Sequence, residues 1–241
     1  MKLTVLSDIH LEFITNYKPI VSRLLHHKNK TDVCILAGDI GHCNEPIFSN
    51  FLNEIRKIFQ KVIVVPGNHE YVPREPMKII DKKLNALCKS NDCIFLNKAY
   101  TYIDNIKFIG CTLWSDTDDK SLNSDFMDNM YTKKYLPDLY HDHLEWLSAE
   151  LNKSVISSVV ITHHCPSFKL KSTKFPLNDR SKYFYSNLDY LIKEPIKLWL
   201  CGHTHCPARV MINNVPVIIN PVGYVNEKNL WDESLVIDVF A

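Results

Sequence analysis

The 241-residue sequence has neither an excess of one charge nor a long apolar run. Its 28 Lys and Arg residues nearly balance 27 Asp and Glu residues, which leaves a formal net charge of +1. Bulk electrostatics therefore give no reason to expect a nucleic-acid or membrane surface as a partner. No apolar stretch approaches the roughly 20 residues that a membrane-spanning helix needs, so we expect no membrane partner.

The sequence also lacks a secretory signal and a disulfide or zinc pattern of cysteines. The first apolar run, Leu3–Leu6, is shorter than the roughly 7–15 residues of a signal-peptide core. Eight cysteines are present, but no two of them form a CxxC pair. Reduced thiols are the expectation for such a chain, and together these absences predict a cytoplasmic protein.

Repeats, low-complexity tracts and linkers are missing too, so we expect residues 1–241 to form a single domain. What the sequence does contain is a series of short apolar runs, each followed directly by polar residues. Continuous runs of this kind, rich in β-branched residues, are typical of strands buried on both faces. The five runs are Leu3–Leu6, Val33–Ala37, Val62–Val65, Val159–Ile161 and Leu198–Cys201.

Helical spacing of apolar residues lies between these runs, over residues 47–59, 77–87 and 139–151. Strands that alternate with helices predict parallel βαβ units and an α/β fold. The pairs Asp104-Asn105 and Asn213-Asn214 suit tight turns, so each predicts a hairpin. Residues 115–136 and 165–187 show no clear periodicity, and we expect loops there.

The polar clusters after the strands carry the chemistry. Ligands of open α/β sheets bind outside the carboxyl ends of the strands, so the fold should gather these clusters at one edge. The residues concerned are Asp8, His10, Asp39, Asn68, His69, His163, His203 and His205. Imidazole, carboxylate and amide groups suit intermediate divalent metals, and the set is too large for one tetrahedral zinc ion. Two ions with two carboxylates would leave a charge of about +2, which attracts a phosphate and acidifies a bound water.

The motifs DIH, GDI, GNHE, THH and GHTH, in this order, resemble the five motifs of the calcineurin-like metallophosphoesterase superfamily. The segments SDIHLEF, VPGNHEY and INPVGY further resemble a group of cytosolic bacterial and phage phosphoesterases. The resemblance implies an α/β fold in which two mixed β-sheets, flanked by helices, form a four-layer sandwich. It also implies hydrolysis of phosphate esters by a dinuclear metal centre with a bridging hydroxide.

The resemblance assigns each site residue a role. Asp8, His10 and His205 would hold one metal ion, and Asn68, His163 and His203 would hold the other. Asp39 would bridge the two ions, and His69 would be the catalytic residue that meets the phosphoryl or leaving oxygen. His163 is preferred to His164 because the family ligand is the first histidine after the strand. Mn or Fe is the expected metal, with Zn, Ni, Co and Mg as alternatives.

The expected substrate is a small phosphomonoester or phosphodiester, which could be nucleotide-related. A nuclease acting on nucleic-acid ends is one alternative, and a non-catalytic binding module is another, as in the retromer subunit that shares this fold. Retention of His69 and of every ligand favours the enzyme. The oligomeric state stays open.

Two competing interpretations involve cysteines. Cys201, His203, His205 and Cys206 could form a structural zinc site, and Cys165 could be a thiol nucleophile. His26 and His27 are expected to be structural. His42, His141 and His143 are further candidates for contacts with the substrate, and Glu70 and Tyr71 for support of the catalytic histidine.

Overall fold

The computed structural model describes the chain except for residues 73–74, 117–129, 174–176, 228–230 and 241. The described residues form two mixed β-sheets. The first sheet has the strand order β11-β1-β2-β3-β4. Its strands are β1 Lys2–Leu6, β2 Val33–Ala37, β3 Lys61–Val65, β4 Ile94–Phe95 and β11 Ile237–Asp238. β1 to β4 run parallel, and β11 pairs with β1 antiparallel.

The second sheet has the order β5-β6-β7-β8-β10-β9. Its strands are β5 Ala99–Ile103, β6 Ile106–Cys111, β7 Ser158–Thr162, β8 Ile196–Cys201, β9 Ala208–Ile212 and β10 Val215–Ile219. β6, β7, β8 and β10 are parallel neighbours, whereas β5 and β9 are antiparallel edge strands. The sheet therefore presents several strand carboxyl ends along one edge.

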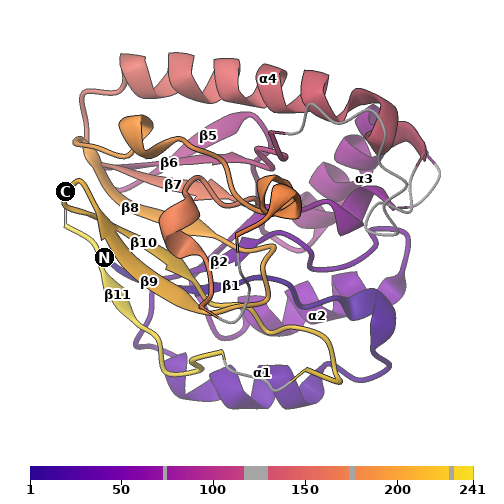
Figure 1. The fold of residues 1–241 in the computed structure, drawn as a ribbon. Helices are drawn as coiled ribbons and strands as arrows, with labels where there is room; N and C mark the ends of the chain where they lie inside the picture. The colour runs from indigo at the N-terminus through magenta and orange to yellow at the C-terminus, as the bar shows by residue number, and fades with distance from the viewer. Residues whose placement is uncertain (73–74, 117–129, 174–176, 228–230, 241) are drawn as a thin grey trace.

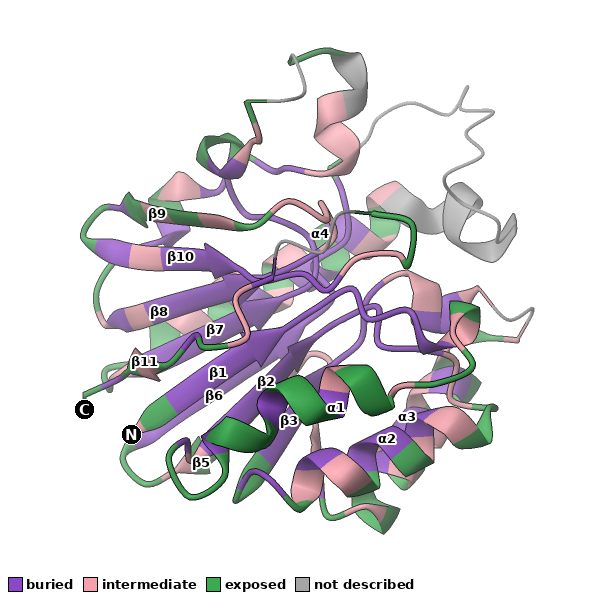
Figure 2. Cartoon of the chain, turned by 90° about the horizontal axis from the view of Figure 1, so that it is seen from below, coloured by how far each residue is buried: buried purple, intermediate pink, exposed green. Residues whose placement is uncertain are grey.

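The two sheets lie face to face between helices (Figure 1). The helices are α1 Lys18–Leu24, α2 Pro46–Arg56, α3 Met77–Ser90 and α4 Met130–Lys153. α1, α2 and α3 bury their apolar residues against the first sheet, and α4 packs on the second. A third apolar cluster, with Val5, Ile63, Phe108 and Leu200 among its members, fills the space between the sheets. The central strands β1, β2, β3, β6, β7, β8 and β10 are buried over most of their length (Figure 2). The architecture is the four-layer sandwich that the sequence implied.

Most of the predicted elements are confirmed. All five apolar runs are strands, and both predicted hairpins form, with Asp104, Asn213 and Asn214 in the left-handed conformation that a tight turn requires. The helices predicted over residues 47–59, 77–87 and 139–151 correspond to α2, α3 and α4.

The loop predicted for residues 115–136 is wrong at its end, because α4 already begins at Met130. Residues 117–129 of that segment lie outside the described residues. Pro137 sits inside the helix and has no amide hydrogen to donate, and the helix continues through it although the residues before it show no clear apolar periodicity. Residues 174–176 of the segment 165–187 lie outside the described residues, and the described part contains the short 3-10 helices Phe168–Leu170 and Asp179–Tyr183.

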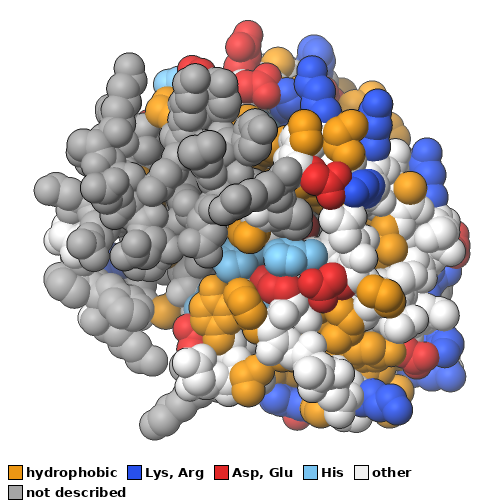
Figure 3. Space-filling model, turned by 90° about the vertical axis from the view of Figure 1, so that its right-hand side faces the viewer, with side chains coloured by type: hydrophobic (Ala, Val, Ile, Leu, Met, Phe, Trp, Pro, Cys, Tyr) orange, Lys and Arg blue, Asp and Glu red, His pale blue; other side chains and the backbone are white. Residues whose placement is uncertain are grey.

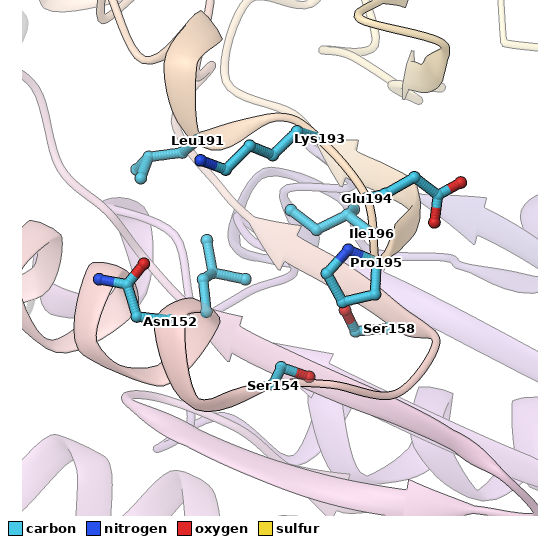
Figure 4. Close-up of a pocket in the computed structure, with 9 residues that line it drawn as sticks. Asn152, Ser154, Ser158, Leu191, Lys193, Glu194, Pro195 and Ile196 are labelled. Carbon is cyan, nitrogen blue, oxygen red and sulfur yellow. The ribbon is translucent and has the colours of Figure 1, made fainter.

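One small cavity lies far from the polar strand ends. It sits between the end of α4 and residues 191–196, beside Ser158 and Ile196 (Figure 4). These two residues begin β7 and β8, and a five-residue strand is roughly 15 Å long. The cavity is therefore at the opposite edge of the second sheet. Among the described helices, none combines the length and the apolar character needed to cross a membrane.

The close approach of the two sheets generates a test at Gly110 in β6. A Cβ atom there would lie 2.6 Å from Leu96 Cβ and 2.8 Å from Val65 Cγ2, so the sheets would have to move apart. We expect Gly110→Ala to lower the free energy of unfolding by about 1–3 kcal/mol, measured by urea denaturation. Val65→Ala should relieve part of this cost, so the double variant should be more stable than the sum of the two single effects predicts. Strict additivity would show that Val65 is not what obstructs the new methyl group.

Candidate functional site

The carboxyl ends of strands from both sheets bring the predicted site residues together. Asp8, His10 and His205 each place one ligand atom within 4.8 Å of the others, and Asp39, His163 and His203 form a second such group. Asn68 joins the second group, because its Oδ1 atom lies 3.1 Å from His163 Nε2. Histidine side chains appear at the surface beside acidic and hydrophobic ones on this face (Figure 3). The two groups are potential metal sites.

The backbone at these residues has an uncommon conformation. The positive φ angles are 54° at Asp8, 53° at His10, 54° at Asp39, 72° at His203 and 49° at His205. Residues other than glycine adopt this left-handed region rarely and at a cost, and such strain concentrates at functional sites. Each strand thus turns sharply where it ends, and the turn directs the side chain toward the edge of the sheet.

Backbone hydrogen bonds between the loops maintain these turns. The Asp8 amide donates to Gly38 O at 2.9 Å, the Gly202 amide to His163 O at 2.9 Å and the Gly223 amide to Asp8 O at 2.8 Å. Gly38 has a φ of +86°, and a Cβ atom on it would lie 2.3 Å from His163 Nδ1. The glycine that precedes Asp39 is therefore needed for the imidazole of His163 to pack this closely.

The hydrogen bonds of the first group fix the tautomers of its histidines. His10 Nδ1 lies 3.0 Å from Glu12 Oε1, and His205 Nδ1 lies 2.7 Å from Glu227 Oε2. A carboxylate only accepts, so each Nδ1 carries the hydrogen. The two Nε2 atoms then present lone pairs to each other at 3.0 Å, with Asp8 Oδ1 3.6 Å from His205 Nε2. Acceptors that converge in this way need a proton or a metal ion between them.

The second group has the same property. His163 Nδ1 lies 2.9 Å from the Ala37 carbonyl oxygen, and His203 Nε2 lies 3.1 Å from that of Tyr183. Both carbonyls accept, so His163 Nε2 and His203 Nδ1 are the free ring nitrogens. His163 Nε2 faces Asp39 Oδ2 at 3.2 Å. Burial by itself lowers the pKa of His163, but Asp39 raises it to about 10, so a proton occupies this position when no metal ion does.

Asp39 lies between the two groups. Its Oδ2 atom is 3.2 Å from His163 Nε2 and 3.9 Å from His10 Nε2. Its Oδ1 atom accepts from the backbone amide of His69 at 2.8 Å. Although burial opposes ionisation, the neighbouring histidines hold the pKa of Asp39 well below its usual value. The residue is therefore a carboxylate that both groups share.

His69 points to a different neighbourhood from Asn68, which precedes it. Its Nδ1 atom lies 3.0 Å from Glu12 Oε1, and its Nε2 atom lies 3.5 Å from the hydroxyl of Tyr224. Burial alone would lower the pKa of His69, but the bond to Glu12 and the charge of Asp39 raise it to about 9. The Nε2–H of His69, which has only the long contact with the Tyr224 hydroxyl among the described residues, can thus donate to a group outside the two candidate metal positions.

Sequence analysis gave no role to three residues that shape the site. Glu12 is buried, and one of its oxygens accepts from both His10 and His69; these bonds outweigh the effect of burial and lower its pKa to about 2. Glu227 orients His205, and its carboxylate also accepts from the amide of Tyr224. Glu12 and Tyr224 lie inside the segments SDIHLEF and INPVGY, which was the available signal.

Glu70, for which a supporting role was expected, lies beneath the site. It is fully buried and accepts from the backbone amides of Asp39, Ile40, Gly41 and Gly67. One side chain therefore fixes the loop after β2 to the loop after β3. Tyr71, its neighbour, donates instead to Asp81 and packs against Trp114.

The structure supports the cysteine-based zinc site and the thiol nucleophile less than it supports the two groups at the strand ends. None of the potential metal groups among the described residues contains a cysteine, and Cys165 is buried with its thiol donating to Gly202 O. His27 is structural, since it bonds to Thr31 and to the Glu233 carbonyl. His143 is buried and accepts from the Leu113 amide. His42 pairs only loosely with Glu45, at 3.7 Å.

His164 differs from His163 in its surroundings. It is fully buried, its Nδ1 atom faces the Thr112 carbonyl, and its ring lies 4.1 Å from that of His203. Burial lowers the pKa of His164 well below the usual value, so it packs as a neutral ring behind His203.

Some known proteins are similar to this chain over nearly its whole length, and others over a part of it. Protein L509 of Acanthamoeba polyphaga mimivirus is 29% identical over 269 aligned positions, which cover 98% of this chain and 96% of that protein. The acyl-carrier-protein phosphodiesterase PptH of Mycobacterium tuberculosis is 38% identical over 82 residues, covering 33% of this chain and 24% of PptH.

Solved structures share the fold. The crystal structure of the phosphopantetheinyl hydrolase PptH superimposes with a TM-score of 0.70 and 19% identity, covering 92% of this chain and 89% of that one. A dimetal phosphatase from Danio rerio matches with a TM-score of 0.54 and 11% identity, over 91% and 87% of the two chains.

The sequence pattern of one family extends over most of the chain and over all the candidate metal ligands. It matches residues 1–207 and is that of the calcineurin-like phosphoesterases. The chain therefore belongs to the calcineurin-like phosphoesterase family and is a hydrolase of phosphoric esters.

Proposed function

We propose that this protein hydrolyses phosphate esters with two divalent metal ions held by the two groups at the strand ends. Asp8, His10 and His205 would hold one ion, and Asn68, His163 and His203 the other. Asp39 would bridge them. The observation that carries this proposal is the convergence of lone pairs, above all the 3.0 Å between His10 Nε2 and His205 Nε2, with both Nδ1 atoms bonded to carboxylates.

The donor set fits transition metals. Four imidazole nitrogens with carboxylate and amide oxygens suit Mn, Fe or Zn, whereas Mg prefers oxygen ligands. We propose Mn or Fe as the working metals. When bound, a pair of such ions supplies positive charge for the phosphoryl group and lowers the pKa of a water toward that of a nucleophile.

The chain's own residues then divide the remaining work. Glu12 and Glu227 hold the rings of His10 and His205 in orientation, because each accepts from the Nδ1–H of its partner. His69 is fixed by Glu12 at Nδ1 and would donate its Nε2 proton to the departing oxygen. Glu70 accepts hydrogen bonds from the backbone amides of both Asp39 and Gly67, and these bonds keep the two residues at a fixed separation.

Phosphodiesters are the substrate class we propose first. PptH is named as a phosphodiesterase, is 38% identical over the matched segment and shares the fold with a TM-score of 0.70. Purified protein loaded with Mn²⁺ should be assayed on bis-p-nitrophenyl phosphate and on p-nitrophenyl phosphate. A higher kcat/KM for the monoester would contradict the preference for diesters, and the absence of turnover on both with every metal would contradict the proposed function.

Asp39→Asn should weaken metal binding in both groups at once. The variant keeps the shape of the side chain but removes the charge that both groups share, so we expect fewer than two metal ions per chain by elemental analysis after dialysis. Asp142→Asn removes an exposed carboxylate that pairs with Lys98 and serves as the control. Two tightly bound ions together with full turnover in Asp39→Asn would mean that Asp39 is no bridge.

His69→Asn should separate catalysis from metal binding. No proposed ligand is lost, so metal content should stay near that of the wild type. Positioned proton transfer contributes about 10²–10⁴-fold, and we expect turnover of alkyl esters to fall at least ~100-fold. Esters of p-nitrophenol should suffer less, because their leaving group needs no proton.

The matched control for that experiment is His26→Asn, at an exposed histidine in the 3-10 helix Leu25–His27. If His69→Asn hydrolysed alkyl esters at the wild-type rate, or if it simply lost its metal ions, His69 would not be the proton donor.

A further inference from the structure

The geometry points to a binding site for a planar aromatic ring on the leaving group of the substrate, formed by Phe13 and Tyr224 beside His69. This inference rests on the proposed function and extends it to the substrate class. The esters concerned are those whose departing alcohol carries a flat ring close to the ester oxygen, such as an arylmethyl group or a heterocyclic base.

Phe13 is an apolar ring in an unexpected place. It ends the 3-10 helix Leu11–Phe13, which directly follows His10, and 61% of its surface is exposed. Burial of an aromatic side chain is normally favourable, and this ring stays exposed directly beside His10 and His69, where a bound substrate group would cover it.

The ring of Phe13 adjoins the catalytic centre. Its centroid lies 6.1 Å from that of His69, 6.0 Å from that of His10 and 5.7 Å from that of Tyr224. Tyr224 is half-buried and packs against both His10 and His205, with centroids 4.4 and 4.5 Å apart. Its amide bonds to Glu227, which fixes the loop that carries it.

The three rings form a corner. The planes of Phe13 and His69 meet at 79°, those of Phe13 and Tyr224 at 67° and those of His69 and Tyr224 at 60°. None of these pairs is stacked face to face, and Phe13 keeps 61% of its surface exposed. A flat group that enters the corner can therefore lie on the exposed face of Phe13 and meet Tyr224 with its edge, and both arrangements are favourable for aromatic pairs.

The position of His69 indicates which part of the substrate lies in this corner. Its Nδ1 is bonded to Glu12, so only Nε2 faces the corner, 3.5 Å from the Tyr224 hydroxyl. A proton donor must lie within hydrogen-bond reach of the departing oxygen. The substituent on that oxygen, rather than the phosphoryl group, is then what touches Phe13.

The test uses metal-loaded protein and three methyl phosphodiesters whose leaving alcohols are benzyl alcohol, cyclohexylmethanol and methanol. All three are alkyl alcohols, so leaving-group acidity differs little, and benzyl and cyclohexylmethyl differ mainly in planarity. We expect kcat/KM to be about tenfold higher for the benzyl than for the cyclohexylmethyl ester, as is typical of an aromatic pair.

Phe13→Ala should remove this preference, lowering kcat/KM for the benzyl ester about tenfold more than for the methyl ester. Phe13→Leu retains apolar volume without a flat face and should lose the preference as well. Phe240→Ala makes the same chemical change at a 75% exposed ring near the C-terminal strand β11 and should leave the preference intact.

Binding of benzylphosphonate and ethylphosphonate, measured by calorimetry on the metal-loaded protein, separates the two proposals. Loss of about tenfold in benzylphosphonate affinity in Phe13→Ala supports the aromatic site even if turnover is slow. Equal handling of benzyl and cyclohexylmethyl groups by the wild type, or an equal loss on every ligand in Phe13→Ala, overturns it. Hydrolysis of none of the esters, with benzylphosphonate still bound through Phe13, would instead overturn the proposed function.

Discussion

The organisation of this protein depends on acceptor groups that are forced to face one another. Four histidines have one ring nitrogen bonded to a carboxylate or a carbonyl, and their other nitrogens converge with Asp8 and Asp39 at the strand ends. Lone pairs at about 3 Å repel unless a proton or a metal ion lies between them. The hydrogen bonds of these histidines to carboxylates and carbonyls therefore determine where a positive charge must lie.

This arrangement strains the backbone, and many contacts elsewhere in the fold offset the strain. Left-handed backbone at five candidate ligands is unfavourable, and each such residue costs about 1–3 kcal/mol. Backbone hydrogen bonds between the loops of the two sheets, and the four amides that bond to Glu70, hold the strained turns. The packed apolar cluster between the sheets keeps the strand ends from separating.

Glu12 connects the proposed metal chemistry to the proposed acid catalysis. A single oxygen of this buried carboxylate faces Nδ1 of His10 and Nδ1 of His69. The same group thus selects the tautomer of a proposed metal ligand and that of the proposed proton donor. Phe13 follows Glu12 directly, so the proposed metal ligand His10, the carboxylate that orients the proposed proton donor and the proposed aromatic site fall within four consecutive residues of the chain.

The sequence by itself determined the five strands, the two hairpins and the order of the polar clusters, because apolar periodicity and turn residues are local properties. It also indicated that Asp8, Asp39 and His163 would meet, since the carboxyl ends of parallel strands share an edge. The start of α4 escaped this reasoning, because the residues before Pro137 show no clear apolar periodicity. Three features depend on contacts between residues up to 211 positions apart. They are the free nitrogen atom of each imidazole, the carboxylate of Glu12 that two histidines share, and the corner formed by Phe13, His69 and Tyr224. Only the tertiary structure decided them, because no local pattern specifies the partner of a side chain that lies on another loop.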